Sequence, residues 1–220
     1  WYSYLAQRIG GVDLYNEVCS GDKNFTEDAY VQAGEEIKAL AKKGFINGCM
    51  SVDATTAEAL FAAGKGAILI TGSWSIPTFT EDPERAKDFS YFPFPVAEGG
   101  KEDEAGYLYG GVANTLAISR STKNKDAVVK FLKYMMSEEE QTLSVERTGT
   151  FSTVKVSPKE ENMDPLAYQF SQYVSDGVEG FIPYTDQALP PEQAENLLNA
   201  LTAIVAEDNA DVKAELAKIK

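Results

Sequence analysis

Carboxylates and aromatic rings are the side chains abundant enough in this chain to build a functional site. Asp and Glu together number 34, and two carboxylates at a suitable separation can cleave a glycosidic bond. The two densest carboxylate runs have structural explanations, however. Glu138–Glu140 fall in the first turn of an expected helix, where the helix dipole favours negative charge, and Glu102–Glu104 fall in a solvated loop. The sequence therefore does not favour a catalytic carboxylate pair.

Other catalytic chemistries lack their residues. The chain has no histidine, which removes Ser-His and Cys-His nucleophiles, imidazole-bound zinc and His-ligated haem. The sequence contains no glycine-rich phosphate motif, and Gly64-Lys65-Gly66 follows a helix and precedes a strand, the reverse of a phosphate loop. The serine of Gly72-Ser73-Trp74 lacks the second glycine of a nucleophile elbow. We expect a binding protein rather than an enzyme, with no metal and no cofactor.

Aromatic side chains remain as candidates. The chain has 11 Tyr, 11 Phe and 2 Trp. A flat ring with a polar tip suits a sugar, which has an apolar face and a rim of hydroxyls. Alternatively, most of these rings merely cover the edge of the core. The rings at the ends of expected elements are Trp1, Tyr2, Tyr4, Trp74, Tyr107, Tyr109 and Tyr184.

Trp74 stands where a ligand is expected. Thr55 and Glu58 have the spacing of a capping box for a helix that Gly64 ends. The apolar run Ala67–Ile70 then predicts a buried strand, and open α/β sheets bind ligands beyond the carboxyl ends of such strands. Position alone leaves a place in the core equally open for Trp74.

The elements around these candidates predict an α/β fold, because helices alternate with a few strands. Gly10-Gly11 loosens the first helix, and the spacing of Ser137 and Glu140 predicts a second capping box. The expected helices cover Tyr2–Val18, Thr26–Lys43, Lys125–Met136, a stretch from Ser137 to about Arg147, a stretch opening at Asp164-Pro165, and the amphipathic segment from Ala194 onward. Thr115–Ser119 is predicted as a further strand and Phe151–Val156 as an extended segment. The two prolines of Phe89–Pro95 favour an edge strand or a departing extended segment over a central strand.

The composition of the chain disfavours some classes of binding partner. The net charge of −14 disfavours nucleic acid and anionic membranes. No apolar run approaches the ~18 residues of a membrane span. Cys19 and Cys49 could form one disulfide in an exported protein, or stay as two free thiols. Because the chain begins at Trp1 without Met or a leader, we expect a mature product or a fragment of a longer protein.

Several segments follow one another in an order shared with a known family. They are FAAGKGAILITGSWS, YFPFP, YGGVANTLAIS, STKNKDAVVKFLKYMMSEEEQ, TGTFSTVK and YTDQALPP. With this order, the chain resembles the extracellular solute-binding proteins of carbohydrate ABC importers, the family that includes the maltose-binding protein. The likeness covers nearly the whole chain.

The resemblance implies a periplasmic-binding-protein-like fold of two α/β lobes with the ligand in the cleft between them. Residues 1–108 and 157–220 would belong to the carboxyl-terminal lobe. Residues 109–156 would form the hinge and a crossover segment of the amino-terminal lobe, most of which has no counterpart here. Trp74 would stack on a sugar ring, and the other residues implied at the site are Trp1, Tyr2, Tyr109, Gly110 and Gly111.

The resemblance also implies the partners. These are a sugar or oligosaccharide and the ABC permease subunits in the membrane. The protein would be a monomer outside the cytoplasm, either as a cell-surface lipoprotein or in the periplasm. The alternatives are a carboxylate-dependent glycoside hydrolase and a sugar-sensing or adhesion module without a transporter.

Overall fold

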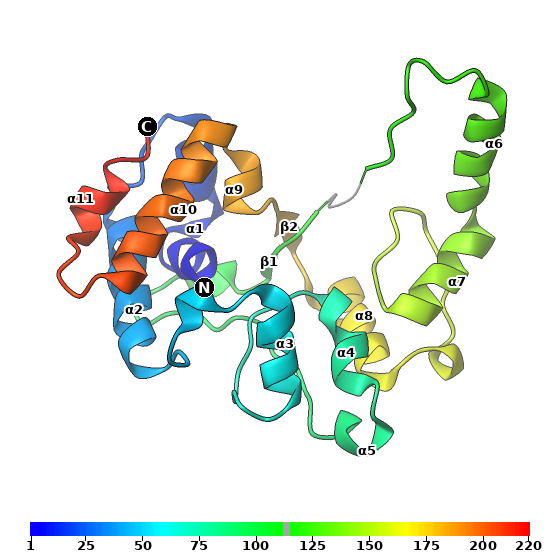
Figure 1. Ribbon diagram of the computed structural model, residues 1–220, viewed down its shortest axis with the longest axis horizontal. Coiled ribbons are helices and arrows are strands. Elements are labelled where there is room, and N and C mark those ends of the chain that lie inside the picture. The colour runs from blue at the N-terminus through cyan, green and yellow to red at the C-terminus, as the bar shows by residue number, and fades with distance from the viewer. Residues whose placement is uncertain (112–114) are drawn as a thin grey trace. The chain divides into compact units, whose positions relative to one another are not determined.

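The computed structural model of the chain describes residues 1–111 and 115–220 (Figure 1). Residues 112–114, which open the predicted amino-terminal-lobe part of the crossover, lie outside the described residues. The chain divides into two compact units, and each is described by itself below. The first unit comprises residues 1–53, 92–111 and 178–220, and the second comprises residues 54–91 and 112–177. The three-part lobe assignment given above stays a prediction.

The first unit is built mainly of helices. Helix α1 packs against α2, and α10 packs against α2, α9 and α11 (Figure 1). Their apolar faces form one core that includes Tyr30, Ala33, Ile204 and Leu216. The helices are α1 (Tyr2–Ser20), α2 (Asp28–Lys43), α9 (Thr185–Ala188), α10 (Pro191–Ala206) and α11 (Val212–Leu216), with 3-10 turns at Cys49–Ser51 and Glu102–Glu104.

Helix α1 is interrupted where the sequence predicted it. Gly11 has a φ of 86° and non-helical geometry, so two helical stretches meet there at a kink. A Cβ at this position would lie 2.7 Å from Nζ of Lys101. Glycine adopts this left-handed conformation without the steric cost that other residues meet.

A small parallel sheet lies in the same unit. Strands β1 (Tyr107–Tyr109) and β2 (Gly180–Ile182) pair with Leu108 opposite Phe181. Most of the chain between them, residues 112–177, belongs to the second unit, so the pairing joins segments far apart in sequence. The sequence analysis predicted neither strand.

The second unit is also mostly helical, and several of its helix ends follow from local sequence. The Ser137 side chain accepts a hydrogen bond from the backbone N–H of Glu140, and Gly149 ends the same helix with a φ of 66°. Asp164 accepts from the backbone N–H of Ala167 at 3.2 Å. The helices are α3 (Ala54–Ala62), α4 (Ile76–Thr80), α5 (Pro83–Ala86), α6 (Lys125–Met135), α7 (Glu138–Thr148) and α8 (Pro165–Gly177), with 3-10 turns at Ser73–Ser75 and Glu160–Asn162.

The predicted strands at Ala67–Ile70 and Thr115–Ser119 are wrong as assignments of secondary structure, and Phe89–Pro95 is a segment without strand pairing, which excludes the edge strand of its two predicted alternatives. Among residues 1–111 and 115–220, the strands that pair are β1 and β2. The three predicted segments are irregular or extended, and Ile68 and Leu116 are exposed. An apolar run indicates a preference for burial, but a strand also needs a neighbouring strand, which local sequence does not supply. At the level of the family fold, the predicted α/β class is confirmed by the comparisons reported below.

Both cysteines are free thiols in this structure. Cys19 lies near the end of α1 and packs against the core, and burial raises the pKa of its thiol. In the part of the chain that the structure describes, no helix combines the length and apolar character needed to cross a membrane.

The raised pKa of Cys19 predicts how it reacts. A thiol reacts as the thiolate, so a raised pKa moves the onset of reaction to higher pH. In a Cys49→Ser chain, the pH at which alkylation by iodoacetamide reaches half its maximal rate should lie above that of a short unstructured cysteine peptide. Equal midpoints would contradict the burial of Cys19, and the same measurement on Cys19→Ser identifies any contribution from Cys49.

Candidate functional site

Trp74 lies in the 3-10 turn Ser73–Ser75, immediately before α4. Its side chain is 57% exposed, whereas Ser75 and Ile76 on the following positions are buried. The possibility that Trp74 is a core residue is therefore wrong for this structure. The turn presents an indole ring to solvent, where an apolar ligand face could cover it.

A hydrogen-bonded cluster holds this turn. The Ser75 hydroxyl donates to Glu58 Oε1 at 2.5 Å. The Thr71 hydroxyl oxygen lies 2.7 Å from Ser75 Oγ and 3.4 Å from Glu58 Oε1. Glu58 was predicted to complete a capping box with Thr55. Helix α3 instead begins at Ala54, so Thr55 lies inside it and the Glu58 carboxylate serves the Trp74 turn.

Gly72 gives the indole ring its room. A Cβ on Gly72 would lie 2.1 Å from Cζ3 and 2.4 Å from Cε3 of Trp74. The φ of Gly72 is −104°, which any residue can adopt. A larger residue here would displace the ring, which lies against the backbone, although the backbone conformation itself would allow any residue.

Other predicted site residues lie in the first unit, in an aromatic cluster. Trp1 contacts Phe94 edge-on with ring centroids 6.0 Å apart. Tyr4 stacks on Phe94 at 4.9 Å with an interplanar angle of 9°, and the rings of Tyr4 and Tyr109 meet at 87° with their centroids 4.9 Å apart. Tyr184 stacks on Tyr109 at 6.3 Å. The cluster connects the start of α1 to β1 and to the segment that precedes it.

Tyr2 and Tyr109 lie inside this unit rather than on its surface. Tyr2 is 3% exposed, and its hydroxyl donates to the Tyr30 carbonyl oxygen. Tyr109 is buried, and its hydroxyl donates to the carbonyl of Ser3 at 3.0 Å. Burial raises the pKa of both phenols, so both stay neutral. In this structure, neither ring offers a face to a ligand.

Gly110 and Gly111, the predicted hinge glycines, differ in their constraints. The Gly110 N–H donates to the carbonyl of Ile182 at 2.9 Å, and a Cβ there would lie 2.9 Å from Phe181. Gly111 has a φ of 140°, and a Cβ there would meet no atom within 4 Å. Gly110 is fixed beside the sheet, and the backbone of Gly111 adopts a conformation that other residues rarely reach.

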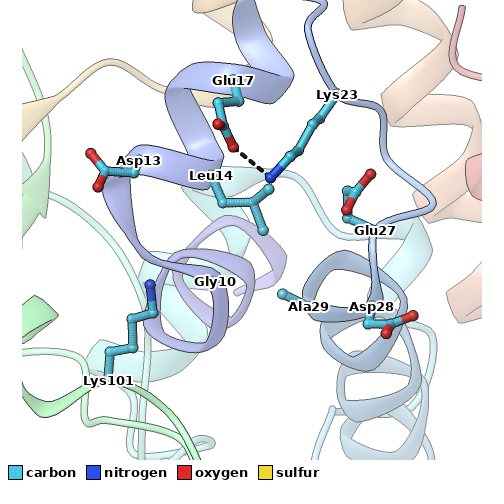
Figure 2. A pocket seen from close by; sticks show the side chains of 9 residues that line it. All are labelled: Gly10, Asp13, Leu14, Glu17, Lys23, Glu27, Asp28, Ala29 and Lys101. Atoms are coloured by element: carbon cyan, nitrogen blue, oxygen red, sulfur yellow. Dashed lines mark ion pairs between the residues drawn. The ribbon is translucent and has the colours of Figure 1, made fainter.

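A separate groove lies on the first unit between α1 and the start of α2 (Figure 2). Its volume is about 380 Å³. Lys23 pairs with Glu17 at 2.7 Å in its wall, and this contact raises the pKa of the lysine. The groove contains none of the predicted site residues. Its lining is Gly10, Asp13, Leu14, Glu17, Lys23, Glu27, Asp28, Ala29 and Lys101.

Metal binding is not indicated by the described residues. Within residues 1–111 and 115–220, no group of three or more His, Cys, Asp or Glu side chains is arranged to hold an ion. The two residues that sequence analysis missed at the Trp74 turn are Thr71 and Ser75. No local sequence signal indicates their contacts, because their partner Glu58 lies on α3 and is brought to the turn only by the folded chain.

Comparisons with known proteins agree with one another. A family model described as bacterial extracellular solute-binding protein matches residues 1–142. The maltotriose-binding protein of Pyrococcus abyssi is 31% identical over 132 residues, which cover 56% of this chain and 27% of that protein.

Several solved structures match almost the entire chain. One comes from work on xylan utilization by the thermophilic bacterium Caldanaerobius polysaccharolyticus and has a TM-score of 0.88 at 25% identity. The match covers 100% of this chain and 57% of the chain in that structure. A chitin oligosaccharide binding protein has a TM-score of 0.84 at 24% identity, with 99% of this chain and 54% of its own covered. This chain therefore spans about half the length of the solved structures that it matches.

The similarity in fold extends over the whole chain, and the family model covers well over half of it. The predicted resemblance and the periplasmic-binding-protein-like fold are thereby confirmed. The chain belongs to the family of bacterial extracellular solute-binding proteins.

Proposed function

We propose that this chain is the sugar-binding component of an ABC importer and that Trp74 stacks on a ring of its saccharide ligand. The observation that carries the proposal is an exposed indole on a turn held by hydrogen bonds from both flanks. An exposed tryptophan leaves apolar surface in contact with water, and covering that surface with the C–H face of a sugar is favourable.

The relatives support the choice of ligand class. One relative is named for maltotriose and a second for chitin oligosaccharides, and a third comes from work on xylan utilization. These ligands differ in their sugars but share rings with apolar faces and rims of hydroxyls. We infer a saccharide ligand for this chain, held in the whole protein in a cleft between two lobes.

Binding without catalysis is part of the proposal. The Glu138–Glu140 run occupies the first turn of α7, as an N-terminal helix turn favours. Glu104 accepts a hydrogen bond from Gln7 at 2.8 Å. A glycoside hydrolase would return shortened saccharides, whereas a binding protein returns its ligand intact. Mass spectrometry of the incubated sugars separates these two functions.

Replacing Trp74 with Ala is expected to weaken saccharide binding about 10- to 30-fold. Losing the covered apolar face of an indole removes about 1.5–2 kcal/mol, and each 1.4 kcal/mol corresponds to a factor of ten in affinity. Isothermal titration with maltotriose, a chitin trisaccharide and a xylan trisaccharide measures the effect. Trp74→Tyr keeps a stacking ring and should lose less.

Phe131→Ala is the matched control. Phe131 belongs to the same unit and is 57% exposed, the same fraction as Trp74. Its truncation removes an exposed ring without touching the Trp74 turn, so affinity should stay unchanged. If both alanine variants bind the sugars like the unmodified chain, Trp74 is not the stacking residue.

The partner and location complete the proposal. Solute-binding proteins of this family are described as extracellular. We propose that this protein acts as a monomer outside the cytoplasmic membrane, as a lipoprotein or in the periplasm, and delivers its sugar to ABC permease subunits. Co-purification of a permease with the tagged protein from its own cell membrane supports a transport role. Recovery without a permease favours a sensing or adhesion module.

A further inference from the structure

We propose that Glu58 and Ser75 are positioning residues that fix the orientation of the Trp74 ring before any ligand binds. This inference rests on the proposed function for its consequence, since an oriented ring matters only where a ligand stacks on it. Its structural content stands on the hydrogen bonds of α3 with the turn Ser73–Ser75 and can be tested without a ligand.

The two ends of the Trp74 segment are held by one carboxylate. Ser75, which follows Trp74, is 1% exposed, and its hydroxyl donates a hydrogen bond to Glu58 Oε1 at 2.5 Å. Thr71, three residues before Trp74, places its hydroxyl within 2.7 Å of Ser75 Oγ and 3.4 Å of the same Glu58 oxygen. The segment between these anchors is therefore closed into a short loop, with Trp74 near its carboxyl end.

The anchor is strong because it combines charge with burial. A hydroxyl that donates to an ionised carboxylate makes a shorter and stronger bond than one to a neutral acceptor. Ser75 is shielded from water, which would otherwise compete for its proton. Glu58 lies on helix α3, so the turn is anchored to a helix rather than to another loop.

Gly72 also limits the position of the ring. The indole lies directly over its backbone, where a Cβ would come within 2.1 Å of the ring. The backbone of the loop thus supports one face of Trp74 while the ring as a whole remains 57% exposed. A ring that is supported on one face and exposed on the rest is suited to receive a flat apolar partner.

Preorganisation gives the cluster its functional consequence. Ordering a free side chain during binding costs free energy that a ring already held in place does not lose. Removing the Glu58–Ser75 bond should therefore weaken saccharide binding about two- to tenfold, although neither residue needs to touch the sugar. The same removal should increase the motion of the ligand-free ring.

Fluorescence of Trp74 provides the direct test. The chain has 2 Trp residues, so in a Trp1→Phe background Trp74 is the sole tryptophan of the chain. Time-resolved anisotropy of the ligand-free protein should show larger nanosecond motion in Ser75→Ala and in Glu58→Ala than in the parent. Glu58→Gln retains an acceptor oxygen for Ser75 and should restore much of the restriction.

Two glycine variants control for backbone effects. Gly72→Ala should shift the emission and the anisotropy of Trp74, because the new methyl group occupies the place of the ring. Gly66→Ala is the matched control, since a Cβ at Gly66 would meet no atom within 4 Å. Unchanged Trp74 anisotropy in both Ser75→Ala and Glu58→Ala, with thermal midpoints showing folded proteins, would overturn the inference.

The affinity measurement separates this inference from the proposed function. With maltotriose, a chitin trisaccharide and a xylan trisaccharide as probes, Ser75→Ala is expected to raise the Kd, and Gly66→Ala is not. If Trp74→Ala abolishes binding and Ser75→Ala leaves the Kd unchanged, positioning is wrong and the proposed function stands. If no trisaccharide binds, the proposed function fails, and the ligand-free anisotropy alone decides the inference.

Discussion

Replacing Arg8 with Met should lower the free energy of unfolding of the first unit by about 3–5 kcal/mol. Arg8 is 0% exposed in the middle of α1. Its guanidinium donates to the carbonyl oxygens of Phe94 (3.2 Å), Glu104 (2.6 Å), Ala105 (3.2 Å) and Tyr107 (3.1 Å). Methionine fills similar space but donates no hydrogen bond, so these carbonyls would lose their charged partner inside the protein.

The geometry of the guanidinium explains why the Arg8 side chain alone contributes so much to the free energy of unfolding. The planar guanidinium has five N–H donors in a fixed fork, and here they bind the chain segment that leads into β1. Arg8 also lies over the ring of Tyr4 at 5.3 Å from its centroid. The side chain therefore connects α1 with the segment that precedes β1, and the aromatic cluster with both.

Urea denaturation followed by near-ultraviolet circular dichroism measures the loss. Arg120→Met makes the same chemical change at an exposed position and should shift the midpoint little. Arg8→Lys keeps the charge, but its single ammonium cannot serve four carbonyls and should recover less than half of the stability. A midpoint for Arg8→Met equal to that of Arg120→Met would show that the Arg8 hydrogen bonds contribute little.

Local sequence predicted what depends on local contacts. The cap at Ser137 and the kink at Gly11 were each predicted from a few residues, because their hydrogen bonds and φ angles are set by near neighbours. Helix α2 follows the same rule, since its apolar stripe at helical spacing, with Tyr30, Ala33 and Ile37, specifies both the helix and its buried face.

Contacts between distant segments were not predictable in this way. Arg8 was not a candidate for burial, because its acceptors are carbonyls about a hundred residues later in the chain. Strands β1 and β2 escaped notice because three-residue strands are defined by their pairing rather than by their composition. The apolar run Ala67–Ile70 shows the converse, an apolar composition without a pairing strand among the described residues.

The candidate site depends both on local sequence and on contacts between distant segments. The sequence could single out Trp74 by its type and position but could not decide between core and surface. The folded chain decides for the surface, since the ring is supported by Gly72 and exposed elsewhere. The spacing of Thr55 and Glu58 predicted a capping box, yet the Glu58 carboxylate accepts a hydrogen bond from Ser75 instead. A carboxylate on a helix can accept from several donors, and the tertiary packing determines which donor lies within reach.

Helix α11 shows how few side chains hold the end of the first unit. It spans Val212–Leu216, and Asp211 caps it by accepting from the backbone N–H of Ala214 at 2.9 Å. A helix this short has little stability of its own in water. Val212 and Leu216 therefore hold it against α2, where a Cβ on Gly34 would lie 2.4 Å from Cγ1 of Val212.

Leu216→Ala should consequently destabilise the first unit by about 3 kcal/mol or more, because the lost methyl groups leave a cavity in a core that cannot easily collapse. Leu216 is 0% exposed, whereas Leu198 on α10 is 55% exposed, so Leu198→Ala makes the same truncation at the surface as a matched control. Urea midpoints of the two variants measure the difference, and amide hydrogen exchange should show the loss of protection concentrated in α11 and the facing turns of α2. Equal midpoints for the two variants would mean that α11 is not anchored through Leu216. Loss of protection spread evenly over the unit would instead show that α11 and the rest of the helical core unfold together, with Leu216 as a part of that single core.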